Sequence, residues 1–377
     1  MNLLPDALAG ARAESDRRFM RRALALARAR AGLTTPNPSV GCVLVRGGRL
    51  VGQGATGRGG RPHAETIALS RAGRLARGAT AYVTFEPCAH RGRTPACAQA
   101  LVAAGIARAV VGCLDPYPPV RGRGIAILRR AGISVETGVL ENECRALNEG
   151  FITRVTRRRP FGILKLATSL DGRIAATSGD SQWISSPQSR AIVHRWRREC
   201  DAVVVGAGTV VTDNPRLTCR IVRGRDPVRV VVDARLRTPH AALIFTERSN
   251  TTAMLVTLRK NVQRARRRYA NGRVEVIGCA GRDGEINLKA MMAEFARRGW
   301  CKVLFEGGAH LAGSALRARI IDRVAFFIAP KVLGAGLPAV QGLDTHRVRE
   351  AIGLANVSLR RIGGDLLIEG RPITAPR

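Results

Sequence analysis

Three residues that can ligate a metal stand near one acidic residue in the first third of the chain. His63-Ala64-Glu65 is followed by Pro87-Cys88, and Cys97 comes later in the same stretch. One His and two Cys can supply three ligands to a tetrahedral zinc and leave the fourth position open to water, as a catalytic site requires. We therefore predict a zinc ion held by His63, Cys88 and Cys97.

Glu65 is suited to be the proton carrier of such a site. It lies two residues after His63, so on a helix its carboxylate can stand beside the metal without binding it. Zinc lowers the pKa of bound water from about 15.7 to about 7. Glu65 would take the water proton and return it to a departing amine, as in zinc deaminases. A single Cys is more often a small core residue, and His-x-Glu is common by chance, but their ordered combination is far rarer.

Strands and helices alternate in the first half of the chain, which indicates a layered α/β sheet. Pro62 and Pro95 are typical of helix starts, and Gly73 of a helix end. The predicted elements are helix 15–30, strands 40–45 and 50–51, helix 63–71, strand 81–85, helix 96–104, strand 109–112, helix 123–130, strand 134–137 and helix 141–154.

A second α/β pattern begins after a basic segment that ends at Pro160, so we predict domains at 1–155 and 160–377. The predicted elements are strand 162–167, helix 187–198, strands 202–205, 228–232 and 253–256, helix 288–297, and strands 302–305, 323–328, 357–361 and 366–369, with a variable loop at 238–250. Two glycine-containing turns, 206–209 and 306–313, could let backbone N–H groups approach a phosphate. Neither matches the Rossmann fingerprint, and each alone is more often only a turn.

The combined motifs resemble those of the bifunctional deaminase/reductase family of riboflavin biosynthesis. The first half shows Asn37-Pro38, Gly41-Cys42 and the long Cys88-to-Cys97 spacing with Gly92-Arg93-Thr94-Pro95. The second half, nearly all of which is covered, shows Lys165-x-Ala167-x-Ser169-Leu170-Asp171-Gly172-Arg173, Gly179-x-Ser181-x-Trp183-Ile184, Gly206-x-Gly208-Thr209-Val210-x-x-Asp213-Asn214-Pro215-x-Leu217-Thr218-x-Arg220, Phe305-Glu306-Gly307-Gly308 and Ala329-Pro330-Lys331-x-Leu333-Gly334. The resemblance implies a cytidine-deaminase-like three-layer α/β/α domain, followed by a dihydrofolate-reductase-like α/β domain that uses NADPH.

The resemblance also implies site residues in the second half. Cofactor contacts would come from Ala167, Trp183, Thr209, Asp213, Gly308, Ala309, His310, Leu311, Ala312, Gly313 and Ser314, and substrate contacts from Ser181, Arg197, Leu217, Arg220 and Glu306. Arg197 and Arg220 suit a phosphate, because a guanidinium binds phosphate through a fork of N–H groups. Glu306 could bind sugar hydroxyls or the amino group. Asp171 is as well explained by a structural turn as by a role in the site, and Trp183 by packing as by ring contact.

The implied function is zinc-dependent hydrolytic deamination of 2,5-diamino-6-(phosphoribosylamino)pyrimidin-4-one, followed by NADPH-dependent reduction of the ribosyl to a ribityl side chain. Four pocket positions depart from the family pattern, namely Thr56, Ile67, Ala89 and Tyr117. Because a site that loses a polar partner can lose discrimination, these departures leave open a paralogue with a retuned or inactive deaminase domain in an azapteridine-type pathway. Simple drift in a slower but authentic riboflavin enzyme fits them too.

The composition of the chain limits the other classes of protein to which it could belong. The chain has 377 residues, 45% of them hydrophobic, and nine cysteines, an odd number that does not suggest a disulfide framework. The start of the chain lacks the pattern of a secretory signal and no apolar run would span a membrane, so we expect a cytoplasmic protein.

The net charge of +34 raises a rival hypothesis, a nucleic-acid base deaminase or binding protein. The positive charge is spread over both halves of the chain rather than concentrated in one patch. A function in nucleic-acid binding would also leave the motifs of the second half without a role. The family resemblance also implies a homo-oligomer.

Overall fold

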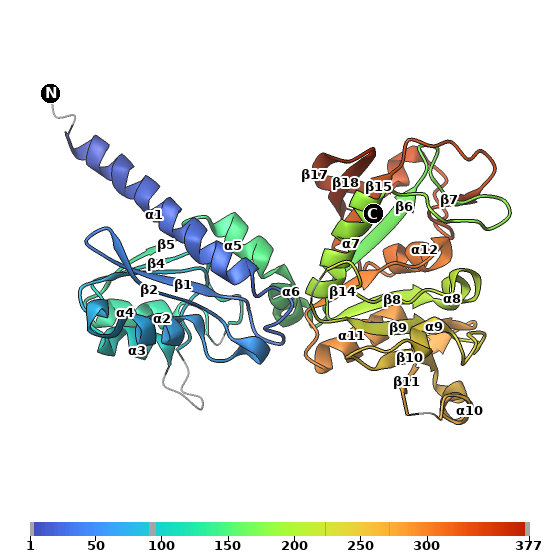
Figure 1. Cartoon of the computed structure of the whole chain (residues 1–377), viewed down its shortest axis with the longest axis horizontal. Coiled ribbons are helices and arrows are strands. Elements are labelled where there is room, and N and C mark those ends of the chain that lie inside the picture. Colours follow the sequence, from blue (N-terminus) through green and yellow to red (C-terminus); the bar gives the residue numbers. More distant parts are fainter. Residues whose placement is uncertain (1–3, 90–95, 119, 223, 271, 374–377) are drawn as a thin grey trace. The chain divides into compact units, whose positions relative to one another are not determined.

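The computed structural model describes residues 4–89, 96–118, 120–222, 224–270 and 272–373. The chain forms two compact units, residues 1–158 and 159–377. Each unit is built around its own sheet (Figure 1).

A five-stranded sheet forms the centre of the first unit, in the order β2-β1-β3-β4-β5. β1 pairs antiparallel with β2 and with β3, whereas β3, β4 and β5 run parallel to one another. The strands are β1 (Gly41–Arg46), β2 (Arg49–Ala55), β3 (Thr80–Val83), β4 (Arg108–Val111) and β5 (Ser134–Thr137). Because β3 and β4 are parallel neighbours, the loops that follow them lie at the same edge of the sheet.

Helices cover both faces of this sheet. The helices are α1 (Leu4–Arg28), α2 (Ala64–Ala72), α3 (Cys97–Ala103), α4 (Arg123–Arg130), α5 (Glu141–Leu147) and α6 (Glu149–Arg157). In Figure 1, α1 and α5 lie on one face, and α2, α3 and α4 on the other. α1 packs so closely on β1 that a Cβ atom added to Gly41 would lie 1.9 Å from the carbonyl oxygen of Ala23. The predicted three-layer α/β/α architecture is confirmed.

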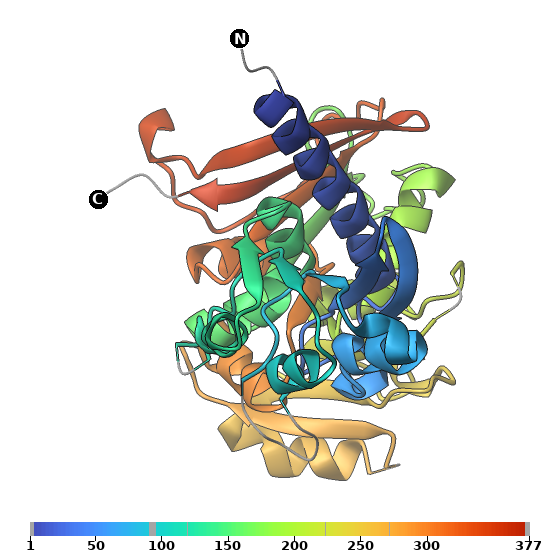
Figure 2. The same ribbon diagram turned by 90° about the vertical axis from the view of Figure 1, so that its left-hand side faces the viewer.

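The first helix is longer than predicted. α1 begins at Leu4 rather than near Ser15, and its N-terminal end projects beyond the sheet of the first unit (Figure 1 and Figure 2). Phe19, Ala23 and Ala27 are buried, whereas residues 10–15 are exposed. Apolar spacing develops only where a helix meets a core, so it predicted only the part of α1 that lies on the sheet. The alanine-rich remainder is helical by propensity.

The predicted helix at 141–154 is two helices, α5 and α6, separated at Asn148. The buried Asn148 side chain accepts a hydrogen bond from the N–H of Ser39 at 2.8 Å and donates to the Ser39 carbonyl at 3.1 Å. Asn148 therefore ties the end of the first unit to the segment that leads into β1.

A nine-stranded sheet forms the second unit, in the order β11-β10-β9-β8-β14-β6-β15-β18-β17. The run from β11 to β15 is parallel, and β18 and β17 add an antiparallel hairpin. The strands are β6 (Phe161–Thr168), β8 (Ala202–Gly206), β9 (Val228–Val232), β10 (Ala253–Leu258), β11 (Val274–Cys279), β14 (Lys302–Phe305), β15 (Arg323–Ile328), β17 (Gly353–Ile362) and β18 (Asp365–Ile373). Two small pairs are β7 (Arg173–Ala175) with β16 (Leu337–Pro338) and β12 (Gly281–Arg282) with β13 (Glu285–Ile286).

Helices again cover both faces, which confirms the predicted α/β class of the second half. They are α7 (Pro187–Glu199), α8 (Ala207–Asp213), α9 (Leu243–Thr246), α10 (Val262–Arg268), α11 (Leu288–Arg297) and α12 (Ala309–Arg317). Leu164 of β6 belongs to the same buried cluster as Phe295 of α11, whereas its neighbour Ile163 belongs to a second cluster, which includes Phe245 of α9 and Ala265 of α10. Successive strand residues thus face opposite helical layers.

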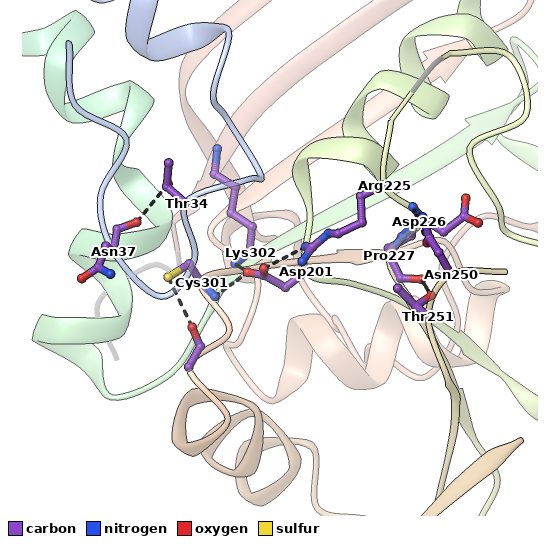
Figure 3. A network of polar contacts seen from close by, with 11 residues as sticks. Thr34, Asn37, Asp201, Arg225, Asp226, Pro227, Asn250, Thr251, Cys301 and Lys302 are labelled. Carbon is purple, nitrogen blue, oxygen red and sulfur yellow. Dashed lines mark hydrogen bonds and ion pairs between the residues drawn. The ribbon is translucent and has the colours of Figure 1, made fainter. Parts of the chain in front are cut away.

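A carboxylate holds the amino ends of the two central strands together (Figure 3). Asp201 accepts hydrogen bonds from the N–H groups of Cys301 at 2.6 Å and Lys302 at 3.0 Å, and from the Arg225 guanidinium at 3.2 Å. β8 and β14 are thereby fixed at the ends opposite to those where their glycine-containing turns begin.

Several elements of the second unit were not predicted. The predicted loop 238–250 contains the short helix α9, and α8, α10, α12 and β11 were also missed. α10 carries four arginines in seven residues and buries only Ala265, so it shows little apolar periodicity. No helix in the described ranges is long and apolar enough to cross a membrane.

Candidate functional site

The three predicted zinc ligands come together at one edge of the first sheet. His63 is the N-cap of α2 and makes no capping bond, Cys88 lies in the loop after β3, and Cys97 begins α3. His63 Nδ1 lies 3.1 Å from Cys97 Sγ and 3.6 Å from Cys88 Sγ, and the three donor atoms all lie within 4.8 Å of one another. Zinc bonds of about 2.0 Å to nitrogen and 2.3 Å to sulfur place these atoms about 3.5 Å apart in a tetrahedron. The donor set and its spacing therefore fit zinc.

The protonation of this cluster also suits a metal site. A hydrogen bond from Cys97 lowers the pKa of the Cys88 thiol to about 4, and the same pairing raises the pKa of Cys97. The N–H of Cys97, in the first turn of α3, also donates to Cys88 Sγ at 3.3 Å. One thiolate is thus stabilised before any metal binds, as a zinc ligand requires.

Glu65 lies in the first turn of α2, beside the cluster, with 4% of its surface exposed. Burial raises the pKa of its carboxyl to about 7, and Cys97 is its hydrogen-bonding neighbour. A carboxyl group that can hold or release a proton near neutral pH is therefore placed next to the three donor atoms.

The four departures from the family pattern have different surroundings. Thr56 is buried, and its hydroxyl accepts a hydrogen bond from the Val40 N–H at 3.0 Å, so it supports the entry to β1. Ile67 and Ala89 are half-buried, and Tyr117 is exposed. The motif Gly92-Arg93-Thr94-Pro95, and with it the helix start predicted at Pro95, lies outside the described residues.

A cavity of about 730 Å³ opens in the second unit at the carboxyl ends of β6, β8 and β14. All five predicted substrate residues and five of the predicted cofactor residues line it, namely Ser181, Arg197, Leu217, Arg220 and Glu306, and Ala167, Trp183, Thr209, Asp213 and Gly308. The parallel strands thus bring together motifs from distant parts of the sequence.

The two glycine-containing turns meet in this cavity. Gly206 ends β8 and Gly307-Gly308 follows β14, its parallel neighbour, and the N–H of Gly308 donates to Thr209 Oγ1 at 3.0 Å. The other predicted cofactor residues, 309–314, form the first turns of α12 and are absent from the described lining of the cavity. Ala309, Leu311 and Ala312 are buried in the core, and His310 is exposed.

A buried ion pair forms the floor of the cavity. Arg197 donates to both carboxylate oxygens of Glu306, through Nε at 2.7 Å and an Nη atom at 2.9 Å. Burial alone would raise the pKa of Glu306, but the charge and hydrogen bonds of Arg197 outweigh it and lower the pKa. The guanidinium fork of Arg197 is therefore engaged by Glu306, whereas Arg220 is exposed at the cavity.

Lys165 and His194 also line the cavity and were not assigned a role from the sequence. Burial lowers the pKa of Lys165, and the negative charge of Glu306 opposes this shift only in part. The sequence did contain a sign of such a role, since Lys165 is a lysine within an otherwise apolar strand. It precedes Ala167 by two residues, and the two side chains therefore lie on the same face of the strand. His194 precedes Arg197 by one helical turn on α7, and burial, followed by the charges of Arg197 and Arg220, lowers its pKa to about 4.

The sequence left two interpretations open for Asp171 and two for Trp183, and the surroundings of each side chain bear on the choice. Asp171 accepts hydrogen bonds from the N–H groups of Leu333 at 3.1 Å and Gly334 at 2.8 Å, which supports its structural interpretation. Trp183 is 60% exposed and lines the cavity, with the Arg190 guanidinium 4.4 Å from its ring centre. The indole of Trp183 is therefore not packed in the hydrophobic core.

Comparison with known proteins identifies both halves. The family model of the cytidine and deoxycytidylate deaminase zinc-binding region matches residues 13–113, and that of the RibD C-terminal domain matches residues 160–368. The riboflavin biosynthesis protein RibD of Aquifex aeolicus is 41% identical over 94% of this chain and 98% of its own length. RibD of Escherichia coli is 38% identical over 94% of this chain and 98% of its own length.

Solved structures show the same arrangement of domains in sequence. RibD of Acinetobacter baumannii matches with a TM-score of 0.85 and 36% identity over 96% of this chain and all of that chain. A Thermotoga maritima protein, described as a diaminohydroxyphosphoribosylaminopyrimidine deaminase/5-amino-6-(5-phosphoribosylamino)uracil reductase, matches with a TM-score of 0.85 and 37% identity over 96% of this chain and 100% of its own. The predicted fold class, a deaminase-like domain followed by a reductase domain, is confirmed, and this chain belongs to the RibD family of bifunctional riboflavin biosynthesis enzymes.

Proposed function

We propose that the first unit hydrolyses the 2-amino group of 2,5-diamino-6-(phosphoribosylamino)pyrimidin-4-one and that the second unit then reduces the ribosyl side chain with NADPH. The observation that carries this proposal is the cluster of His63, Cys88 and Cys97 with the buried Glu65 beside it. The printed description of the Thermotoga maritima relative names both activities.

In the deamination, His63, Cys88 and Cys97 would hold the zinc. Bound zinc supplies a water of lowered pKa at neutral pH. Glu65 would accept a proton from the water as its oxygen bonds to the ring carbon, and would deliver that proton to the departing amine, which leaves as ammonia. Its pKa near 7 matches both halves of this transfer.

In the reduction, the sugar ring opens to give an imine. The imine carbon then receives a hydride, and the imine nitrogen receives a proton. NADPH supplies the hydride. Arg220, the exposed guanidinium of the cavity, binds the substrate phosphate. Glu306, held by Arg197, accepts hydrogen bonds from sugar hydroxyls, and Lys165 beside it supplies the proton.

On the cofactor side, we assign Ala167, Trp183, Thr209, Asp213 and Gly308 to NADPH, because these residues line the cavity, whereas a role for residues 309–314 stays a prediction. Asp213 accepts a hydrogen bond from Ser181 at 3.1 Å, which joins the cofactor and substrate sides of the cavity. Cytoplasmic location, homo-oligomerisation and the absence of nucleic-acid binding stay predictions.

Product analysis tests the proposal. Zinc-loaded protein is incubated with the diaminopyrimidinone ribosyl phosphate, first without NADPH and then with it, and the products are identified by mass spectrometry. We expect exchange of one amino group for oxygen in the first stage and gain of a hydride and a proton in the second. Reduction of supplied deaminated substrate without any deamination would instead assign the first unit to another substrate.

A further inference from the structure

We propose that Glu86 is a positioning residue of the deaminase site. Its carboxylate clamps both ends of the loop between β4 and α4, so that Tyr117 and Arg121 are held in a fixed wall beside the reacting base. The inference rests on the proposed deamination, and its first test is independent of that activity.

The Glu86 carboxylate gathers three backbone N–H groups. Oε2 accepts from Asp115 at 3.1 Å and from Gly122 at 3.0 Å, and Oε1 accepts from Gly124 at 3.0 Å. Asp115 stands near the start of the loop, whereas Gly122 and Gly124 stand at its end and in the first turn of α4. Glu86 is only 4% exposed. One buried side chain therefore fixes both ends of the loop.

The same short segment also carries a proposed zinc ligand. Glu86 precedes Cys88 by two residues, and its own N–H donates to the Cys113 carbonyl at 2.9 Å. Gly124 packs so closely that an added Cβ would lie 1.9 Å from the carbonyl oxygen of Pro87. The loop and the ligand segment are thus held as one piece.

A carboxylate suits this position better than an amide. Three donors converge on two oxygens, and a carboxylate is acceptor-only, whereas a glutamine would turn its NH2 group toward at least one donor. The negative charge also lies at the N-terminus of α4, where the helix dipole favours it. None of the ion pairs found among the described residues involves Glu86, so backbone N–H groups compensate its charge.

The clamped loop presents side chains that suit the substrate. Tyr117 is 47% exposed and its N–H donates to Asp115 Oδ1 at 2.8 Å, and Arg121 is also exposed. The loop follows a parallel strand at the carboxyl edge, where ligands bind in α/β sheets. An aromatic ring and a guanidinium there match a phosphate-bearing pyrimidine.

Hydrogen exchange of the loop is the first test. The Glu86→Gln variant is compared with wild type and with Glu143→Gln, the same change at an exposed site. We expect the amides of Asp115, Gly122 and Gly124 to exchange about 10-fold faster or more in Glu86→Gln, because each lost hydrogen bond of this kind is worth about that factor. Unchanged exchange would overturn the proposal. If Glu86→Gln does not fold, Glu86→Asp replaces it in the same experiment. This variant keeps the negative charge but has a shorter side chain, so we expect the same three amides to exchange faster than in wild type, by a smaller factor.

Steady-state kinetics is the second test. We expect Glu86→Gln to raise KM for the diaminopyrimidinone about 10-fold, with kcat within about 3-fold and zinc content unchanged, because the loop supports binding rather than proton transfer. An unchanged KM, or a loss of zinc with unchanged loop exchange, would contradict a positioning role. If wild-type protein does not deaminate this substrate, the proposed function fails, and the exchange experiment still decides whether Glu86 clamps the loop.

Discussion

At the scale of single residues, Glu65 decides whether the first unit can do chemistry. The Glu65→Gln variant keeps the size of the side chain but cannot carry a proton. We expect deamination to fall about 10²-fold to 10⁴-fold, the usual contribution of a general acid/base. Zinc content, measured by atomic absorption, and reduction of supplied deaminated substrate should not change. Deamination at the wild-type rate would remove Glu65 from the mechanism.

The Arg197–Glu306 pair links stability to the reductase site. Its side chains are 12% and 6% exposed, so Arg197→Met leaves a carboxylate buried with less compensation. We expect a loss of about 3 kcal/mol in the free energy of unfolding of the second unit, measured by urea denaturation. The double variant Arg197→Met/Glu306→Leu should recover part of that loss. A double variant that is no more stable than the single one would argue against an uncompensated charge as the cause.

His194 gives the second unit a defined response to acid. Its pKa is lowered from 6.5 to about 4, so the unfolded chain takes up a proton first as the pH falls. The contribution of neutral His194 to stability is therefore complete above about pH 6.5 and is lost between about pH 6.5 and pH 4, at most about 3 kcal/mol. In thermal unfolding across this range, His194→Gln should show a shallower decline than wild type. His240→Gln, at an exposed histidine, serves as the control and should follow wild type.

At the scale of elements, the close crossing of α1 and β1 depends on Gly41. A Cβ there would meet the Ala23 carbonyl oxygen at 1.9 Å, and backbone cannot move aside as a side chain can. We expect Gly41→Ala to destabilise the first unit by about 1–3 kcal/mol, the usual cost of overpacking. Gly10→Ala, in the exposed part of α1 with no atom within 4 Å, should be neutral or slightly stabilising. Equal melting temperatures for the two variants would contradict the packing seen here.

Most of the elements whose bounds agree with the prediction bury apolar side chains, and the mostly exposed β5 is an exception. α4, β5, β9, α11, β14 and β15 have the predicted bounds. α10 and the start of α1 were missed because solvent, not a core, surrounds most of their residues, so no apolar periodicity records them. In the same way, the zinc cluster was visible as residue types and order, whereas the role of Glu86 was not, because its three partners are backbone N–H groups that any residue could provide.

At the scale of the whole molecule, one chain carries two candidate sites, one in each unit. Each unit has its own sheet, its own core and its own candidate site. The comparisons cover both units in relatives of nearly equal length, so the two activities belong to one chain in the family. The net charge of +34 has no structural explanation in either site.

Mixing two variants tests this central claim most directly. Glu65→Gln protein and Glu306→Gln protein are each given the diaminopyrimidinone ribosyl phosphate and NADPH, alone and together, and the products are identified by mass spectrometry. We expect unchanged substrate with the first variant, deaminated but unreduced product with the second, and the fully reduced product with the mixture. A mixture that yields no reduced product, while both variants keep wild-type folding, would contradict two separable sites that act in sequence.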